Sequence, residues 1–482
     1  GCRDIFRIGG DKTYGIFSAT YGATYTHLDK NTTNTGAVYD DLLESPLFVP
    51  IKDLKDPNSK YGNPDTYYND YYYSPGQIIK STRNLNAEND INANLALKLK
   101  PWKWLNLTYR ASLDNIQSRN QQEFSGVTYS AFSKSNSEIW YPDPNGTGTI
   151  IKNPNDGAGT KYSATDALPS YGVQNFNNML LTSDFLANFS TKLTKDFSFD
   201  ATAGISYMDN KISWDNISQT ALYFTPYNVQ NFASTPSLSN FTDEARKLGY
   251  LGEATVGYKS FVFVHGSFRT DLDTRLSKAN RYIPYYDIDG SVVLSELFKS
   301  ITENGVLDFA KVRYAHSLTG NVSALAGGSQ YIAYGAYQTM ATYGLAGGFP
   351  YSSSGLGGYS LNPTIANPNI KPEKIREDEV GLDLGFLSDR ITLGGSYYRS
   401  TTKDGIVYAS VSRASGFTQA LVNAANSENK GLELDLGGTI IKHGGLEWSM
   451  KVNWTHQTSK VNSIVSGVTA INVGNNSYAV VG

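Results

Sequence analysis

The sequence of 482 residues is poor in cysteine, in long apolar runs and in excess charge. Its single cysteine, Cys2, excludes an intrachain disulfide framework and any metal cage built from several thiolates. No uninterrupted apolar stretch reaches the roughly 18 residues of a membrane-spanning helix, and the mean hydropathy is −0.35. The formal net charge of −3 lacks the basic excess of a nucleic-acid-binding chain. Composition therefore excludes a helical membrane protein and argues against a nucleic-acid partner.

Motifs that carry catalysis, cofactor binding or metal binding are also missing. The histidines are His27, His265, His316, His443 and His456. None has a partner at metal-site or catalytic-triad spacing, and no His-Glu-x-x-His, Gly-x-Ser-x-Gly or Walker-type sequence occurs. The pairs Asp271/Asp273 and Asp287/Asp289 lack the spacing of a calcium loop with its closing glutamate, so we interpret them as solvated loop residues. The sequence predicts no enzyme, no cofactor and no metal centre.

What the chain does have is a strict apolar/polar alternation, repeated in segments of about ten residues. In residues 105–114, Leu, Leu, Tyr, Ala and Leu alternate with Asn, Thr, Arg, Ser and Asp, and residues 197–207 and 448–455 repeat the pattern. A period of two predicts β-strands with one apolar face, and roughly 9 to 11 residues let a tilted strand cross a bilayer. Aromatic residues make up 13% of the chain, which suits girdles at two membrane interfaces as well as ordinary β-structure. The alternation predicts a transmembrane barrel.

The predicted strands form hairpins with short turns, separated by long segments rich in Gly, Asn, Ser and Tyr. The short turns fall at residues 100–103, 194–196, 259–260, 387–389 and 442–445. The long segments are 29–83, 115–179, 209–247, 270–308, 319–378 and 400–427. Outer-membrane barrels keep short turns on the periplasmic side and long loops outside. This segregation favours a barrel over a soluble β-sandwich.

The C-terminal third carries an ordered series of short motifs. They are Asn367-Pro368-Asn369-Ile370-Lys371-Pro372-Glu373, Glu379-Val380-Gly381-Leu382-Asp383, Tyr397-Tyr398, Lys403-Asp404, Ser415-Gly416-Phe417, Asn423 and Glu428-Asn429-Lys430-Gly431-Leu432-Glu433. Earlier in the chain come Gly9-Gly10-Asp11-Lys12-Thr13, Phe309-Ala310-Lys311-Val312-Arg313 and Thr319-Gly320-Asn321. In order and spacing, the series resembles the barrel of the SusC/RagA-like TonB-dependent outer-membrane transporters, most strongly over residues 309–465.

The resemblance implies an all-β fold, a large antiparallel transmembrane β-barrel with long extracellular loops, in the outer membrane of a Gram-negative bacterium. Plugged barrels of this size have about 22 strands, of which period-two matching finds roughly 12 to 14 here. We therefore expect residues 1–482 to be a single barrel domain. It would be the central portion of a transporter whose N-terminal plug and C-terminal strands lie outside this chain.

The resemblance also implies a function, the import of a large nutrient, either a glycan or a peptide. The implied partners are a SusD-like surface lipoprotein and TonB-ExbB-ExbD, which would act through the absent plug and its TonB box. An alternative is a secreted or surface β-rich domain that binds glycans or acts as an adhesin without transport. In that alternative the strands would bury their apolar faces in a sandwich core.

Aromatic residues cluster in two of the long segments and are the candidate contact residues. They are Tyr67, Tyr68, Tyr71, Tyr72, Tyr73, Trp140 and Tyr141. Their rings combine apolar area with a polar tip, which suits stacking on sugars or gripping peptide side chains. Alternatively, they pack the loops together or form the docking surface for the partner lipoprotein. The sequence leaves both roles open.

Overall fold

A single large sheet dominates the computed structural model of the chain. The structure describes residues 1–65, 67, 73–131, 166–220, 236–303, 305–326, 335, 337–346, 358–464, 470–474 and 477–482. Within these ranges the large sheet has 15 strands, and two further sheets have two strands each. None of the helices in these ranges combines the length and apolar content of a membrane span.

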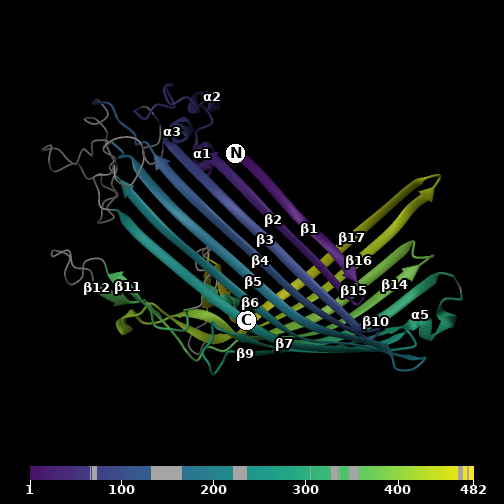
Figure 1. Ribbon diagram of the computed structural model, residues 1–482. Coiled ribbons are helices and arrows are strands. Elements are labelled where there is room, and N and C mark those ends of the chain that lie inside the picture. The colour runs from purple at the N-terminus through teal and green to yellow at the C-terminus, as the bar shows by residue number, and fades with distance from the viewer. Residues whose placement is uncertain are drawn as a thin grey trace.

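The strands of the large sheet follow one another in chain order as antiparallel neighbours. They are β1 (Cys2–Tyr14), β2 (Phe17–Thr32), β3 (Thr82–Trp102), β4 (Leu105–Phe124), β5 (Ser170–Lys192), β6 (Phe197–Thr220), β7 (Ser237–Tyr258), β8 (Val262–Asp273), β9 (Tyr282–Val293), β10 (Leu307–Asn321), β14 (Glu373–Phe386), β15 (Ile391–Ser410), β16 (Gln419–His443) and β17 (Leu446–Ser463). The two-residue β13 (Thr364–Ile365) completes the sheet by pairing parallel to β16. Figure 1 shows the strands side by side in a sheet that curves strongly from β1 to β17, so that β1 to β6 and β14 to β17 slope in opposite directions in this view.

The other elements lie in the connections. They are α1 (Thr35–Glu44), α2 (Ile51–Leu54) and α3 (Pro75–Ser81) between β2 and β3; α5 (Leu294–Leu297) and η2 (Lys299–Ile301) between β9 and β10; η3 (Ser323–Ala326), β11 (Tyr343–Ala346) and β12 (Gly358–Leu361) between β10 and β14; η5 (Arg413–Ser415); and β18 (Ala470–Gly474) with β19 (Ser477–Val480). We call α1 to α3 the helical insert. The predicted short turns are confirmed as hairpin connections, and we call their end of the sheet the turn end and the opposite end the loop end.

The alternation predicted from the sequence gives the sheet two different faces. Phe185 pairs with Ile205, and Ile205 pairs with Tyr250, so these side chains form a row across β5, β6 and β7. All three remain more than two-fifths exposed, so nothing in the described chain covers this apolar face. The opposite, polar face carries Asp184 paired with Ser206. An extended, exposed apolar face fits contact with lipid, and the sandwich packing of the alternative interpretation is absent from the described strands.

The strands run well beyond the ten-residue segments that the alternation marks. β4 has 20 residues, and its second half, from Asn115 to Phe124, is mostly polar on both faces. β16 has 25 residues, which at about 3.3 Å each is roughly 80 Å, far more than a tilted strand needs to cross a bilayer. The predicted strands were too short because the parts of a strand that lie in water are held by backbone hydrogen bonds and need no apolar face. The long segments are therefore partly strand.

Two long strands of the sheet, β1 and β9, were not among those predicted from the alternation. Residues 270–308 were predicted to be one long loop, but they contain the end of β8 and the whole of β9, which pairs with β8 and β10. β9 lacks a clean alternation because Tyr285 and Tyr286 lie on opposite faces and Pro284 interrupts the pattern. With β9 in place, successive strands cross the sheet alternately in both directions. The β9–β10 connection, with α5 and η2, then lies at the turn end as its longest segment.

Buried apolar residues gather at the loop end, away from the middle of the sheet. The rim cluster consists of Leu276, Ile283, Val322, Leu325, Ile370, Ile406 and Leu421. The insert cluster consists of Val49, Leu54 and Tyr67, packed against Leu42 and Tyr61. These two clusters fix the connections that border the polar face, whereas the strands themselves are held mainly by their ladders of hydrogen bonds.

Candidate functional site on the polar face

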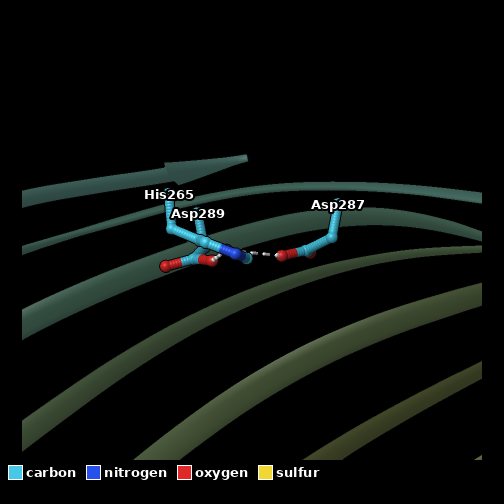
Figure 2. Close-up of side chains that lie close together, drawn as sticks. All are labelled: His265, Asp287 and Asp289. Carbon is cyan, nitrogen blue, oxygen red and sulfur yellow. Dashed lines mark hydrogen bonds and ion pairs between the residues drawn. The ribbon is translucent and has the colours of Figure 1, made fainter. Parts of the chain in front are cut away.

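The polar face brings together three ionisable side chains from two neighbouring strands. His265 lies on β8, and Asp287 and Asp289 lie two residues apart on β9. His265 is paired directly with Asp289, and Asp287 takes the diagonal position on the same face. The His265 Nδ1 lies 2.6 Å from Asp289 Oδ2 and 3.6 Å from Asp287 Oδ2. Figure 2 shows the edge of the imidazole between the two carboxylates. We call these three residues the β8–β9 cluster.

The neighbours of the β8–β9 cluster are small or already paired. Thr255 on β7 is opposite His265, while Ala315 and Ser317 on β10 are opposite Asp289 and Asp287. The nearby Arg313 belongs to the next row, opposite Ser291, and its Nη2 lies 3.5 Å from Glu379 Oε1. Within the described residues, the ion pairs of both aspartates involve His265 alone. A single imidazolium balances only one of the two carboxylates.

Acidic residues extend the polar face from this cluster toward β16. In rows that continue across the paired strands, they are Asp287, Asp289, Glu377, Glu379, Asp383, Glu433 and Asp435. Fewer cations lie beside these residues: Lys311 is opposite Asp383, Arg313 lies near Glu379, and Lys451 lies 3.8 Å from Asp435. This acidic wall gives one side of the polar face a negative potential.

The motifs near the C-terminus meet at the loop end, where Asn423 on β16 is the common partner. Its Oδ1 accepts from the Lys371 amide at 2.8 Å, and its Nδ2 donates to the carbonyls of Lys371 and Asp404 at 2.8 and 2.7 Å. The side chain of Glu373 accepts from the Ile406 amide at 2.7 Å. Motifs about fifty residues apart thus form one unit that ties the β10–β14 connection to β15 and β16. The role of these motif residues is to hold the β10–β14 connection in position against the two strands.

Two other motif glycines are sites of close approach across the ladder. Gly431 on β16 is opposite Tyr398 of the Tyr397-Tyr398 motif, and Gly381 on β14 is opposite Arg313. A Cβ at Gly431 would collide with the Tyr398 ring, and one at Gly381 would collide with the Arg313 guanidinium. Both glycines therefore let a long side chain lie flat against the polar face.

The two candidate aromatic residues that the structure describes are packed inside the loops. Tyr67 is only 8% exposed and belongs to the insert cluster. Tyr73 stacks on Phe124, with ring centroids 6.1 Å apart. Tyr68, Tyr71, Tyr72, Trp140 and Tyr141 lie outside the described residues. A direct contact of this aromatic set with substrate or partner stays a prediction.

The helical insert also holds a buried carboxyl group, that of Asp41 on α1. Asp41 is 1% exposed. Burial raises the pKa of the Asp41 carboxyl to about 6, the Tyr67 hydroxyl opposes the rise, and the negative charge of Glu44 adds to it. The insert therefore carries a group that titrates close to neutral pH.

Residues 6–479 match the protein-family description "TonB dependent receptor-like, beta-barrel". The chain belongs to the TonB-dependent receptor β-barrel family. The match spans nearly the whole chain, and it confirms the SusC/RagA-like resemblance and the antiparallel barrel fold predicted from the motifs and the alternation. The family is one of outer-membrane receptors and transporters of Gram-negative bacteria.

Relatives of this TonB-dependent receptor chain include two curated proteins and one solved complex. TonB-dependent receptor P3 of Formosa agariphila is 22% identical over 54% of this chain and 24% of its own length. TonB-dependent receptor SusC of Bacteroides thetaiotaomicron is 26% identical over 42% of this chain and 19% of its own length. A chain of the RagAB peptide importer in its "open-open" state superposes on 100% of this chain with a TM-score of 0.76 and 16% identity. The present chain covers 48% of that RagAB chain, and the likeness shows a shared fold.

Sequence reasoning missed the β8–β9 cluster of this receptor barrel. It interpreted Asp287 and Asp289 as solvated loop residues, whereas both lie on β9 in the middle of the sheet. The available signal was the two-residue spacing of Asp287 and Asp289, which places both on one face of a strand, whereas their link to His265 depends on the register that pairs Leu272 with Tyr282. Without the recognition of β9 that register could not be counted.

Proposed function

We propose that the chain forms part of the wall of an outer-membrane importer for a large nutrient, a glycan or a peptide. One observation carries the proposal: a single sheet of consecutive antiparallel strands exposes an apolar face and turns a polar face the other way. Such a sheet can face lipid on one side and line an aqueous passage on the other. Membership of the TonB-dependent receptor family supports the class, and we propose residues 1–482 as a single barrel domain.

The proposed partners are TonB-ExbB-ExbD, acting through a plug, and a SusD-like surface lipoprotein. Similarity to SusC and to the RagAB peptide importer supports the pairing. The helical insert gives a physical reason to expect a protein partner. Four of its apolar side chains are each at least two-thirds exposed at the loop end, those of Leu43, Leu47, Phe48 and Ile51. An apolar group of this kind on an extramembrane surface is typical of a protein contact. We propose that the lipoprotein covers it, with the loop aromatics contributing to substrate or partner contact.

The charge of the polar face narrows the proposed cargo. The acidic wall from β9 to β16 repels anions, while the polar face of β3 is rich in asparagine, including Asn84, Asn86, Asn92 and Asn94. Amide side chains bind neutral hydroxyl and peptide groups. We therefore propose a neutral oligosaccharide or a neutral to basic peptide as cargo, taken up without covalent chemistry.

Uptake by the native cell tests the proposal. We would delete the gene and measure accumulation of fluorescent neutral oligosaccharides, basic oligopeptides and acidic oligopeptides, with the restored gene as the control. The expected result is loss of uptake of one neutral or basic class, and loss of the same uptake when a protonophore removes the energy supplied through TonB. Unchanged uptake of all three classes would contradict the function, and selective loss of the acidic peptides would contradict the charge argument.

A further inference from the structure

We propose that the β8–β9 cluster of His265, Asp287 and Asp289 binds a divalent ion of the Zn²⁺ type on the polar wall. This inference concerns ion binding and goes beyond transport. The three donor atoms, one imidazole nitrogen and two carboxylate oxygens, all lie within 4.8 Å of one another. Zn²⁺ bonds to nitrogen and oxygen ligands at about 2.0–2.2 Å, so donors on opposite sides of one ion are about 4 Å apart. Small side-chain rotations therefore bring all three donors to a single ion.

The sheet holds the three side chains in place while leaving one side open. β9 is paired along both of its edges, with β8 and with β10, so the backbone beneath Asp287 and Asp289 is fixed. The side chains of His265, Asp287 and Asp289 keep 26%, 30% and 39% of their surface exposed. An ion can reach them from the polar face, and water can fill its remaining coordination positions. Three protein ligands plus water is a common arrangement for zinc.

Charge distinguishes this cluster from an ordinary ion pair. With His265 protonated, the cluster keeps one uncompensated negative charge, and with a neutral imidazole it keeps two. The two guanidinium groups in the adjoining rows are already paired, that of Arg269 with Asp271 and that of Arg313 with Glu379. A divalent ion balances both carboxylates at once and replaces the proton between His265 and Asp289. Imidazole as a ligand favours Zn²⁺ over Ca²⁺ and Mg²⁺, which prefer shells of oxygen alone.

A second histidine–aspartate pair, on the apolar face, provides a control for the β8–β9 cluster. There His316 Nδ1 lies 2.7 Å from Asp378 Oδ1, and the Tyr314 hydroxyl donates to the same oxygen at 2.9 Å. This pair has one carboxylate, and a phenol already occupies it. His316 therefore serves as a control histidine with the same acidic contact but without a second carboxylate.

Zn²⁺ titration of the whole purified protein tests the inference. We would isolate it in detergent, strip metal with a chelator, remove the chelator and titrate ZnCl₂ by calorimetry. We expect one equivalent to bind, with affinity at least about tenfold weaker in His265→Gln and in Asp289→Asn. His316→Gln should bind as the wild type does. Retained heat-dependent migration on SDS gels would show that each variant is folded.

Three outcomes would overturn the inference. These are the absence of Zn²⁺ binding by the folded wild type, equal binding by His265→Gln, and tighter binding of Ca²⁺ than of Zn²⁺. Co²⁺ provides a second readout, because a nitrogen-ligated Co²⁺ gives visible absorption bands that His265→Gln should change and His316→Gln should not. Neither measurement depends on uptake, so a failed transport assay and a failed metal assay can be told apart.

Discussion

At the residue scale, Asn423 is the side chain on which the motif unit at the loop end most depends. Replacement by alanine removes three hydrogen bonds, to the backbone of Lys371 and Asp404. We expect Asn423→Ala to lower the free energy of unfolding by about 2 kcal/mol, since each net hydrogen bond contributes about 0.5–1.5 kcal/mol. Urea unfolding in detergent measures the change. Asn92→Ala is the control, because Asn92 is exposed and the described structure gives its side chain no hydrogen bond; equal losses would contradict the prediction.

The buried carboxyl of Asp41 predicts that the stability of the helical insert depends on pH. The carboxyl has a pKa of about 6 in the folded insert and about 3.9 in an unfolded chain. Because the folded form binds the proton more tightly, the insert is most stable below about pH 4 and loses stability as the pH rises through about 6. The loss is at most about 3 kcal/mol, from about 1.4 kcal/mol for each pKa unit.

Hydrogen exchange of the α1 amides at pH 5 and pH 8, corrected for intrinsic rates, checks this. The wild type should lose protection at pH 8, whereas Asp41→Asn should be equally protected at both values. Asp40→Asn alters the exposed neighbouring carboxyl and should behave as the wild type does. The prediction fails if the two variants show the same pH dependence.

At the element scale, the β7–β8 turn offers a test of backbone strain. Lys259 and Ser260 both have positive φ, at 44° and 62°, a region that suits glycine better than serine. We expect Ser260→Gly to stabilise the protein by about 0.5–1 kcal/mol, measured as a higher urea midpoint. The β16–β17 turn provides the reverse control. There Gly445 has a φ of 83°, so Gly445→Ser should lower the midpoint, and a shift of both variants in the same direction would rule out the strain argument.

The sequence pattern predicted those parts of the strands whose two faces lie in different surroundings, one apolar and one polar. The alternation from Leu105 to Asp114 marks the part of β4 with one apolar and one polar face, and the fold confirms it. It could not mark the second half of β4, because a strand with water on both sides requires no alternation of apolar and polar residues. β9 was missed for a related reason, since its tyrosines lie on both faces and Ile283 is buried in the rim cluster.

The candidate site was less accessible to sequence reasoning than the fold. Period two alone places Asp287 and Asp289 on one face, but their link to His265 depends on the register of a hairpin that was not recognised. The motif residues behaved differently. Asn423, Gly381 and Gly431 were found because they form a recognisable series, yet their roles as a hydrogen-bond centre and as flat contact sites depend on partners in other strands.

At the scale of the whole molecule, the two faces of the sheet need different surroundings, and the backbone groups along its two edges need hydrogen-bond partners. In the described chain β1 and β17 are the outermost long strands of the sheet. Unpaired backbone groups are costly in a bilayer, so these edges have to be paired there, with each other or with further strands. In the proposed importer the apolar face meets lipid, and the acidic wall and the β8–β9 cluster face the interior.

Introduced cysteines can report the orientation of the proposed wall, because Cys2 is the single cysteine among these 482 residues. In a Cys2→Ser background, Lys278→Cys places a thiol in the β8–β9 connection at the loop end, and Lys103→Cys places one in the β3–β4 turn at the turn end. Both lysines are exposed. If long loops face the exterior, a membrane-impermeant maleimide should label Lys278→Cys on intact cells and label Lys103→Cys only after the outer membrane is opened. A gel shift reports the labelling. The reverse pattern would invert the proposed orientation, and equal labelling of both on intact cells would contradict a membrane-spanning wall.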